Sequence, residues 1–276
     1  DVEQGAQRRP VPPVRPRRAA RDALWGLAYL SDADDDRIQD VVNSGCLPDL
    51  VRLLEHPQSS IVTPALRVVG NISSGSDDQT RRVVESGALP VIGNLLRHEK
   101  RNIRKESCWL LSNVAAAALE QVRAFLDAVV KDSLTGETLV SRVVECATSD
   151  VHDVRCEAIY TLANVCTGRD RANIRRIVGT GAVPNLDVFV EAVEDGHSRI
   201  RTAALEAIGA VYDVLLSRKP GPLVESTIPV PERLRNALYD AMDGYDDDFA
   251  MQAATVARQL GIISADSEDS PFPFGI

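Results

Sequence analysis

Apolar residues recur along this chain at spacings of three and four, which is the pattern of amphipathic helices. In the clearest stretch, SCWLLSN, Trp109 and Asn113 stand four residues apart and therefore share one face of a helix. Apolar and polar residues nowhere alternate for long enough to indicate a strand. Because aromatic residues make up only 4% of the chain, Leu, Val, Ile and Ala must fill the core. The sequence therefore predicts an all-α fold.

A two-residue pattern recurs along the chain. In each case an aromatic residue or an arginine is followed four positions later by a polar residue. The pairs are Trp25 with Tyr29, Arg67 with Asn71, Trp109 with Asn113, and Tyr160 with Asn164. The first three pairs are 42 residues apart, and the fourth lies 51 residues beyond the third. A period near 42 is typical of a helical solenoid, whose units are too small to bury their own apolar faces and therefore stack on their neighbours.

Similar short segments introduce the units, namely SGCLPDL from Ser44, SGALPVI from Ser86 and TGAVPNL from Thr180. Glycine suits the position just past a helix and proline suits the first turn of the next helix, so each segment predicts a helix-to-helix corner. Residues 127–139 (DAVVKDSLTGETL) lack this corner and contain extra residues. We expect a longer loop or a shifted helix there.

The repeat pattern divides the chain into five segments. Residues 1–20 are rich in proline and arginine and are predicted to be disordered. The array occupies residues 21–216, with about four to five units. A proline-rich linker at 217–231, a pair of capping helices at 232–263 and a disordered tail at 264–276 are expected to follow.

Composition and charge exclude several classes of protein. A formal net charge of -9 argues against a protein that follows nucleic-acid phosphates; it suits a basic partner, or serves solubility alone. The five cysteines are an odd number set among apolar residues, so we expect small buried hydrophobic side chains in a reducing compartment. Neither a signal peptide nor a membrane-spanning run is present.

Catalysis is not indicated by the sequence. The four histidines are scattered at corners, no His-Cys-Asp set has the spacing of metal ligands or of a triad, and no phosphate-binding glycine loop occurs. The chain is therefore expected not to be an enzyme and to need neither a metal nor a cofactor.

The segments ALWGLAYLSD, PALRVVGNI, SCWLLSNV and AIYTLANV, set among Gly-x-x-Pro corners, resemble the later armadillo repeats of the importin-α family, adaptors that carry nuclear-localisation-signal cargo. The resemblance covers roughly residues 21–216. It implies an armadillo-repeat, right-handed superhelical α-solenoid carrying the family's minor signal-binding site. It also implies basic cargo proteins, importin-β and an export receptor as partners, no nucleic-acid or membrane partner, and a location in cytoplasm and nucleus.

The paired residues have chemistry that suits such a site. A carboxamide carries both a donor and an acceptor, so it can satisfy a peptide N–H and C=O together. An indole face attracts a cation and packs on its methylene groups, which contributes roughly 0.5–2 kcal/mol. Pairs on successive stacked helices would lie about 10 Å apart and meet roughly every third residue of an extended peptide.

Acidic contacts are placed by the resemblance at four positions, so that the predicted peptide-binding residues are Trp25, Tyr29, Asp32, Arg67, Asn71, Asp77, Glu106, Trp109, Asn113, Glu157, Tyr160 and Asn164. Glu106 and Glu157 stand three residues before an aromatic residue and share its helix face. Asp32 and Asp77 serve equally well as helix caps. Alternatively, the aromatic rings and the amides are buried between neighbouring helices, as large aromatic side chains often are. Their repetition along the chain argues against this alternative.

Two broader alternatives remain open. An armadillo array also serves as a scaffold for protein–protein interaction without any transport activity. The chain has no counterpart of the family's earlier repeats, which carry the major site, or of its importin-β-binding arm, so we expect a fragment, a truncated gene product or a reduced paralogue. The arginine-rich segment of residues 1–18 is either a solvated tail or a basic signal, for another receptor or for the chain's own groove.

Overall fold

The computed structural model describes residues 16–168, 170–179, 186–195, 198–216, 230–244 and 246–264. Within these ranges the chain forms 15 helices and no strand, apart from one isolated antiparallel bridge between Val129 and Thr138. The predicted all-α class is therefore confirmed. One continuous apolar core follows the array from Leu24 to Ala257.

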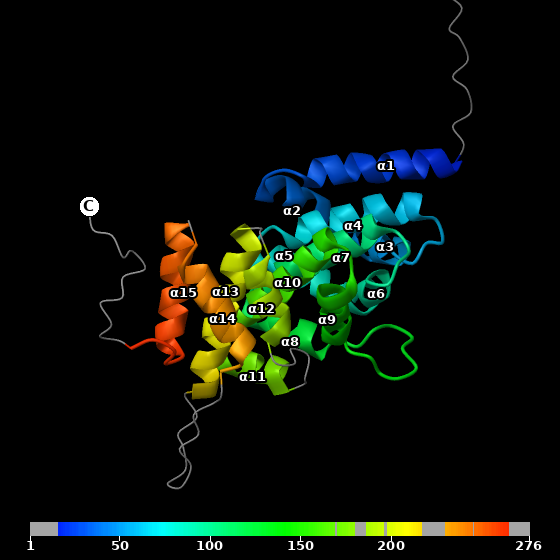
Figure 1. Cartoon of the computed structure of the whole chain (residues 1–276). Coiled ribbons are helices and arrows are strands. Elements are labelled where there is room, and N and C mark those ends of the chain that lie inside the picture. The colour runs from blue at the N-terminus through cyan, green and yellow to red at the C-terminus, as the bar shows by residue number, and fades with distance from the viewer. Residues whose placement is uncertain are drawn as a thin grey trace, which may run out of the picture.

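The helices repeat in sets of three along the chain (Figure 1). The first helices of the sets are α2 (Asp35–Asn43), α5 (Asp77–Glu85), α8 (Leu119–Asp127) and α11 (Arg171–Gly179). The second helices are α3 (Leu47–Leu53), α6 (Ala88–Leu95), α9 (Leu139–Ser149) and α12 (Asp187–Glu194), with α14 (Glu232–Met242) packed on α12.

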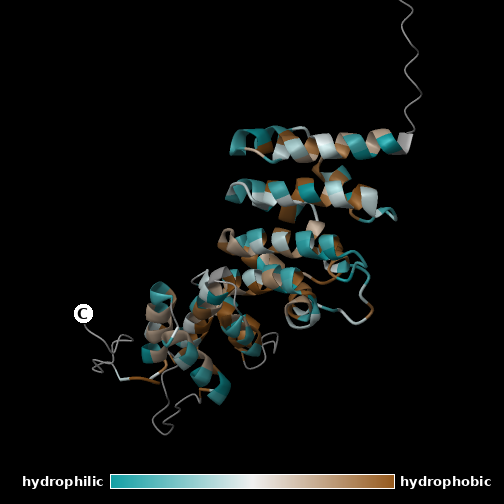
Figure 2. Ribbon diagram, turned by 45° about the horizontal axis from the view of Figure 1, so that its top comes forward, coloured by the Kyte–Doolittle hydropathy of each residue, from teal (hydrophilic) through white to brown (hydrophobic). Residues whose placement is uncertain are grey.

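The third helices form what we call the long-helix ladder. Each packs on the next in the order α1 (Pro16–Ser31), α4 (Ser59–Ser73), α7 (Arg101–Ala116), α10 (His152–Thr167), α13 (Ser198–Leu216) and α15 (Asp247–Gln259). Figure 2 shows the first of these helices lying one below another, with α1 at the top. Side chains such as Ile103, Leu110 and Leu111 of α7 are fully buried between ladder neighbours and the shorter helices. Stacking thus buries faces that a single unit would leave exposed.

The corners form as the glycine–proline segments predict. Gly45 and Gly87 have φ of +73° and +77°, a left-handed conformation that glycine adopts without a Cβ penalty. Pro48 lies in the first turn of α3, where its missing N–H costs no helical hydrogen bond. The third corner, from Thr180, lies outside the described residues.

The expected longer loop lies between α8 and α9. It is pinned by hydrogen bonds from Val130 N to Glu137 O (2.8 Å) and from Lys131 N to Pro90 O (2.9 Å). Val130 is buried against Gly93, which leaves space for it. Thr138 then caps α9, since its side chain accepts a hydrogen bond from Ser141 N. The extra residues therefore form an ordered loop that fills the place of a missing corner.

The chain enters the array earlier than the sequence predicts. Helix α1 begins at Pro16, so the expectation that residues 1–20 are disordered is wrong for the last five of them. Proline is well suited to the first position of a helix, and the arginines and alanines that follow it are good helix formers. Residues 1–15, 217–229 and 265–276, which hold most of the predicted tails and linker, lie outside the described residues. Helices α14 and α15 lie where the capping pair is predicted.

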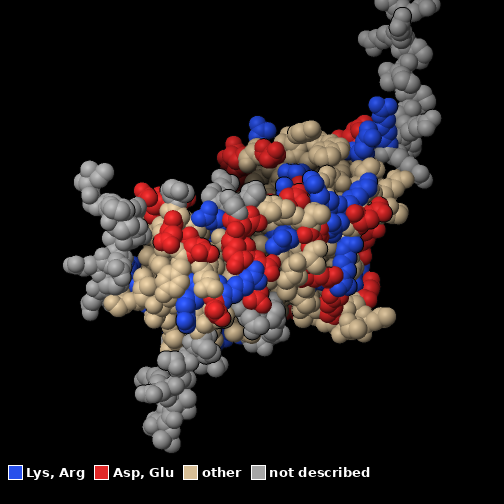
Figure 3. Space-filling view, in the orientation of Figure 1, with Lys and Arg blue, Asp and Glu red and all other residues tan. Residues whose placement is uncertain are grey.

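Ion pairs connect neighbouring units. Arg104 binds the Asp150 carboxylate through Nε and Nη2, at 2.5 and 2.7 Å, and its Nη1 donates to the carbonyls of His98 and Glu99. Burial raises the pKa of Asp150, but the hydrogen bonds from Arg104 and from Val151 N–H lower it more, so the net shift is downward. Most other pairs are exposed and contribute little each. Acidic and basic side chains are accordingly interspersed over the face shown in Figure 3.

Candidate functional site

The predicted residue pairs stand on four consecutive helices of the ladder. Trp25 and Tyr29 belong to α1, and the later pairs to α4, α7 and α10 in turn. Trp25, Trp109 and Tyr160 are half-buried, whereas the Tyr29 side chain is 74% exposed. Residues separated by about one repeat in the sequence are thus brought onto neighbouring helices, as the period of the sequence predicts.

The Trp109 indole lies directly against Gly70 of α4. A Cβ atom added to Gly70 of α4 would lie 2.5 Å from Cζ3 of the indole. The guanidinium carbon of Arg67 lies 5.6 Å from the centre of the same ring, within the range of a cation–π contact. Sequence reasoning missed Gly70, although a glycine in the middle of a helix usually marks a close approach.

The asparagine amides link the ladder helices to one another. Nδ2 of Asn113 donates to Ser73 Oγ at 3.3 Å, and Nδ2 of Asn164 donates to Ser112 O at 3.0 Å. Each bond runs from one ladder helix to the helix before it. Both amides are half-buried, and within the described chain neither amide oxygen has a hydrogen-bond donor. Among the described residues, both oxygens therefore keep free acceptor capacity.

Asn71 departs from the expected arrangement. Its side chain is only 3% exposed, and Nδ2 donates both to Ala28 O (3.1 Å) and to Ser31 Oγ (3.0 Å) of α1. The prediction that this amide faces an open groove is therefore wrong for this structure. The reason is that the end of α1 packs directly over it and takes up both of its donor hydrogens.

Two carboxylates lie next to the aromatic residues of α7 and α10. Glu106 pairs with Arg67, Oε1 to Nη2 at 2.5 Å, while its Oε2 is buried without a hydrogen-bond partner among the described residues. Burial raises the pKa of Glu106, an effect that Arg67 and Lys105 partly offset. Burial also raises the pKa of Glu157, where Lys105 acts against it and the negative charge of Glu106 adds to it. The two carboxylates therefore lie in one partly desolvated region. The positive charges of Arg67 and Lys105 do not fully offset the cost of burying their negative charges.

The two corner aspartates have different environments. Oδ1 of Asp77 accepts a hydrogen bond from Ala118 N at 3.0 Å and so caps the start of α8. This contact favours the capping alternative for Asp77. Asp32 is exposed in the turn after α1.

The structure also brings together a Cys–His–Asp set that sequence reasoning did not find. Cys156 Sγ lies 3.5 Å from Nδ1 of His152, and Nε2 of His152 lies 3.2 Å from Oδ2 of Asp195. Asp195 comes from the next unit, 43 residues beyond His152, so the set has no spacing in the sequence that could have revealed it. Burial, together with the charges of Asp195 and Glu157, raises the pKa of Cys156 to about 11. The thiol is therefore protonated at neutral pH and is a poor nucleophile.

The described residues offer neither a metal site nor a membrane-spanning helix. No group of three or more His, Cys, Asp or Glu side chains in the described ranges has an arrangement that could hold a metal ion. None of the helices that the structure describes combines the length and the apolar character needed to cross a bilayer.

Comparison with known proteins defines the class. The model of the armadillo/beta-catenin-like repeat matches residues 34–74 and 76–116, the sets α2–α4 and α5–α7. A designed armadillo repeat protein, YIII(Dq)4CqI, superposes with a TM-score of 0.72 at 21% identity, covering 90% of this chain and 95% of the other. A second one, in complex with peptide (KR)4, gives a TM-score of 0.73 at 21% identity over the same shares. The chain is an all-α armadillo-repeat solenoid.

A stretch of 51 residues is similar to importin subunits alpha. It is 59% identical over 51 residues to importin subunit alpha-1b of Oryza sativa subsp. japonica, which covers 18% of this chain and 10% of the relative. It is 55% identical over 51 residues to the probable importin subunit alpha-A of Dictyostelium discoideum, over 18% of this chain and 9% of that protein. The matches thus span about a tenth of these relatives.

Proposed function

We propose that the ladder face of α4, α7 and α10 binds extended peptides rich in lysine and arginine. The observation that carries this proposal is the pairing of a half-buried aromatic ring with a half-buried carboxylate on two consecutive ladder helices. Glu106 lies one helical turn from Trp109, and Glu157 lies one turn from Tyr160. Each pair offers a flat apolar wall for the methylene groups of a basic side chain and a negative charge for its end.

The amides supply the contact to the peptide backbone. The free oxygens of Asn113 and Asn164 would accept backbone N–H groups, while their Nδ2 groups keep the ladder helices together. A peptide carbonyl would have to replace a helix-to-helix hydrogen bond, and the long 3.3 Å bond of Asn113 is the easier one to replace. We therefore place the centre of the site at Trp109 and Asn113.

The comparisons support a cellular role for this binding. Similarity to importin subunits alpha, and a matching fold in a protein solved with peptide (KR)4, suggest a nuclear-import adaptor-like protein that binds nuclear localisation signals in cytoplasm and nucleus. Importin-β and an export receptor are further partners of this proposal. The set of contacts would include the predicted residues other than Asn71, which the end of α1 covers, and Asp77, which caps α8.

A scaffold without transport activity is the second candidate. The burial of Asn71 and the helix-to-helix hydrogen bonds of Asn113 and Asn164 favour it, because these contacts give the amides a structural role in the empty protein. The two candidates differ in one measurable respect, since a scaffold has no requirement for a cation-binding surface.

Isothermal calorimetry with an eight-residue peptide of alternating lysine and arginine tests the proposal. We expect micromolar affinity for the chain, weakened by salt, and at least tenfold weaker binding by the Trp109→Ala plus Asn113→Ala variant. An alternating lysine–glutamate peptide is the control for charge. Equal affinity of the variant and the parent chain would refute the proposal and leave the scaffold.

The arginine-rich amino terminus gives a separate prediction. Residues 8, 9 and 15 are arginines that precede α1, and a basic segment of the same chain would compete with a peptide for the ladder face. Deleting residues 1–15, which leaves α1 intact, should raise peptide affinity about threefold or more in the same calorimetric assay. A deletion that changes nothing would show that the segment is only a solvated tail.

A further inference from the structure

Helix α1 is the outermost helix of the ladder, and one of its faces is uncovered. It packs on α4 and α2, and Figures 1 and 2 both show it at the edge of the described chain. The uncovered face is apolar along its length and exposes Ala19, Ala23, Gly26 and Leu30, which follow the spacing of three and four that marks a single helix face. Leu30 is 51% exposed.

The equivalent face is buried on the next three ladder helices. Counting forward from α1 by 42 residues reaches α4, by another 42 reaches α7, and by a further 51 reaches α10. All of the equivalent side chains are at most 5% exposed, namely Ile61, Ala65, Val68 and Ile72, then Ile103, Ser107, Leu110 and Val114, then Val154, Ala158, Thr161 and Val165. An apolar face that the array covers everywhere else indicates an interaction surface on α1.

An apolar groove extends this face toward α3. It has a volume of about 490 Å³ and lies between α1, the end of α3 and the start of α4. Apolar side chains that line it include Ala23, Leu24 and Leu27 of α1, Leu53 of α3 and Ile61 of α4. Because Ala23 belongs both to the exposed face and to the groove, the two form one continuous apolar surface, which we call the α1 surface.

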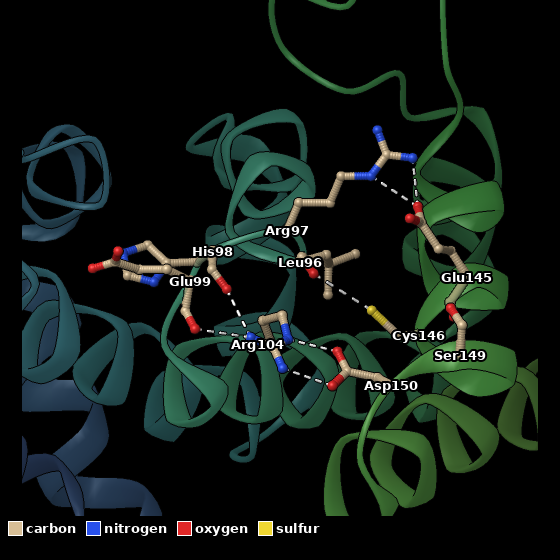
Figure 4. Close-up of a pocket in the computed structure, with 9 residues that line it drawn as sticks. All are labelled: Leu96, Arg97, His98, Glu99, Arg104, Glu145, Cys146, Ser149 and Asp150. Atoms are coloured by element: carbon tan, nitrogen blue, oxygen red, sulfur yellow. Dashed lines mark hydrogen bonds and ion pairs between the residues drawn. The ribbon is translucent and has the colours of Figure 1, made fainter.

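The cavity between the α6–α7 corner and α9 has a different chemistry. Charged side chains line it and pair with one another, Arg97 with Glu145 and Arg104 with Asp150 (Figure 4). Its polar groups are therefore already satisfied within the chain. The α1 surface has more to gain from a partner, because its apolar side chains face water.

The other end of the ladder does not match the α1 surface. Helix α15 is the last ladder helix, and only one of its exposed side chains is apolar, in the set Asp247, Asp248, Met251, Thr255, Arg258 and Gln259. A second copy that stacked its α15 on α1 would bury these polar and charged groups against apolar ones, which is costly. This favours contact between the α1 surfaces of two copies, the self-complementary contact of two-fold dimers.

Charges at the two ends of α1 set the direction of such a pair. Arg18 and Arg21 lie near its beginning, with side chains 74% and 43% exposed, and they share the single carboxylate of Asp22. The corner after α1 carries exposed carboxylates that form no ion pair among the described residues, those of Asp32, Asp34, Asp35 and Asp36. Figure 3 shows blue side chains over the first end of α1 and red ones over the corner. Antiparallel helices would bring the basic end of one copy beside the acidic corner of the other.

We propose that two copies of this chain associate through their α1 surfaces as an antiparallel, two-fold symmetric dimer. With the two-fold axis between positions 24 and 25, Leu30 of one copy lies opposite Ala19 of the other, and Ala23 lies opposite Gly26. The large side chain meets a small one, and the Ala–Gly pair lets the helices approach closely. An interface of about one helix from each copy is small, so we expect a dissociation constant on the order of 10 µM. The α1 surface includes no residue of α7 or α10, so this association can fail without affecting the proposed peptide site.

Sedimentation equilibrium of the full chain tests the proposal at about 1–200 µM. We expect the mean mass to rise with concentration from 30.0 kDa to nearly twice that value. Raising the salt from about 0.05 to 0.5 M should weaken association at least threefold, since opposite charges meet in an antiparallel pair. A mass that stays at 30.0 kDa would overturn the proposal, and so would growth beyond a dimer or stronger association at high salt.

Substitutions test the surface and the direction of the helices. Ala23→Glu should raise the dissociation constant at least tenfold, whereas the matched control Ala172→Glu, at an exposed position of α11, should associate as the parent chain does. Equal association of these two variants would place the interface elsewhere and refute the proposal.

Reversing the charge at either end of α1 tests the antiparallel arrangement. Arg18→Glu plus Arg21→Glu in one chain, and Asp35→Lys plus Asp36→Lys in another, should each weaken self-association at least tenfold, because like charges then meet. An equal mixture of the two variants should form a dimer again. A mixture that stays monomeric would contradict the arrangement. Circular dichroism shows whether each variant folds, and the parent-chain result is decisive even if one does not.

Discussion

Replacing both Glu106 and Glu157 with glutamine is expected to weaken the binding of a lysine- and arginine-rich peptide about 30-fold, without lowering the stability of the fold. Both carboxylates lie beside the aromatic residues of the proposed site, and both have a raised pKa because burial penalises their charge. The empty protein therefore gains nothing from keeping them ionised. A bound cation would supply the positive charge that Arg67 and Lys105 supply only in part.

The sign of the pH dependence follows from the raised pKa values. A carboxyl group whose pKa is higher in the folded chain than in the unfolded one stabilises the fold at low pH, and this contribution is lost as pH rises through the folded pKa. At neutral pH the glutamine variants should therefore be as stable as the parent chain or more so. A cationic peptide favours the ionised form, so peptide affinity should fall as pH is lowered from neutral toward the raised pKa values.

Calorimetry across this pH range and thermal unfolding measure the two effects separately. Glu120→Gln plus Glu232→Gln removes the same charge from exposed positions outside the ladder, and should change affinity less than threefold. A double variant with Glu106→Gln and Glu157→Gln that binds as well as this control would show that the two carboxylates are not part of the site.

Gly70→Ala is expected to destabilise the fold by about 1–2 kcal/mol and to weaken peptide binding about tenfold. The added Cβ would lie 2.5 Å from the Trp109 indole, so the ring would have to leave the position in which Arg67 covers it. Replacing glycine with alanine in a helix interior stabilises the helix by up to about 1 kcal/mol. The steric cost of the clash must be larger than this gain for the variant to be less stable.

Gly26→Ala is the matched control for this substitution. Gly26 lies in α1 beside Trp25, but a Cβ added there meets nothing within 4 Å. This variant should be stabilised by about 0.5–1 kcal/mol, as measured by urea unfolding. Combining Gly70→Ala with Trp109→Phe, whose smaller ring relieves the clash, should recover most of the lost stability but not the affinity. Equal effects of Gly70→Ala and Gly26→Ala would contradict the close contact.

The amino-acid sequence determined the helices, the corners and the period of the array. The spacing of apolar residues, the glycines at positions 45 and 87 and the first-turn prolines act within a few residues of themselves, so they can be read without knowing the neighbours. Helix α1 begins five residues earlier than predicted. The proline- and arginine-rich composition of residues 1–20 indicated disorder, and it was given more weight than the preference of proline for the first turn of a helix. The interval of 42 residues correctly placed the aromatic and amide positions on successive ladder helices.

Only the tertiary structure decided which of these side chains remain available to a ligand. Asn71 and Asn113 stand at equivalent places in the sequence. The end of α1 covers Asn71, whereas Asn113 is half-exposed. Asp77 caps a helix 41 residues further along the chain, and His152 meets Asp195 of the next unit. Contacts of this kind depend on how far one unit is rotated and shifted on the next, a quantity that the packing of the whole array sets and that no local pattern contains.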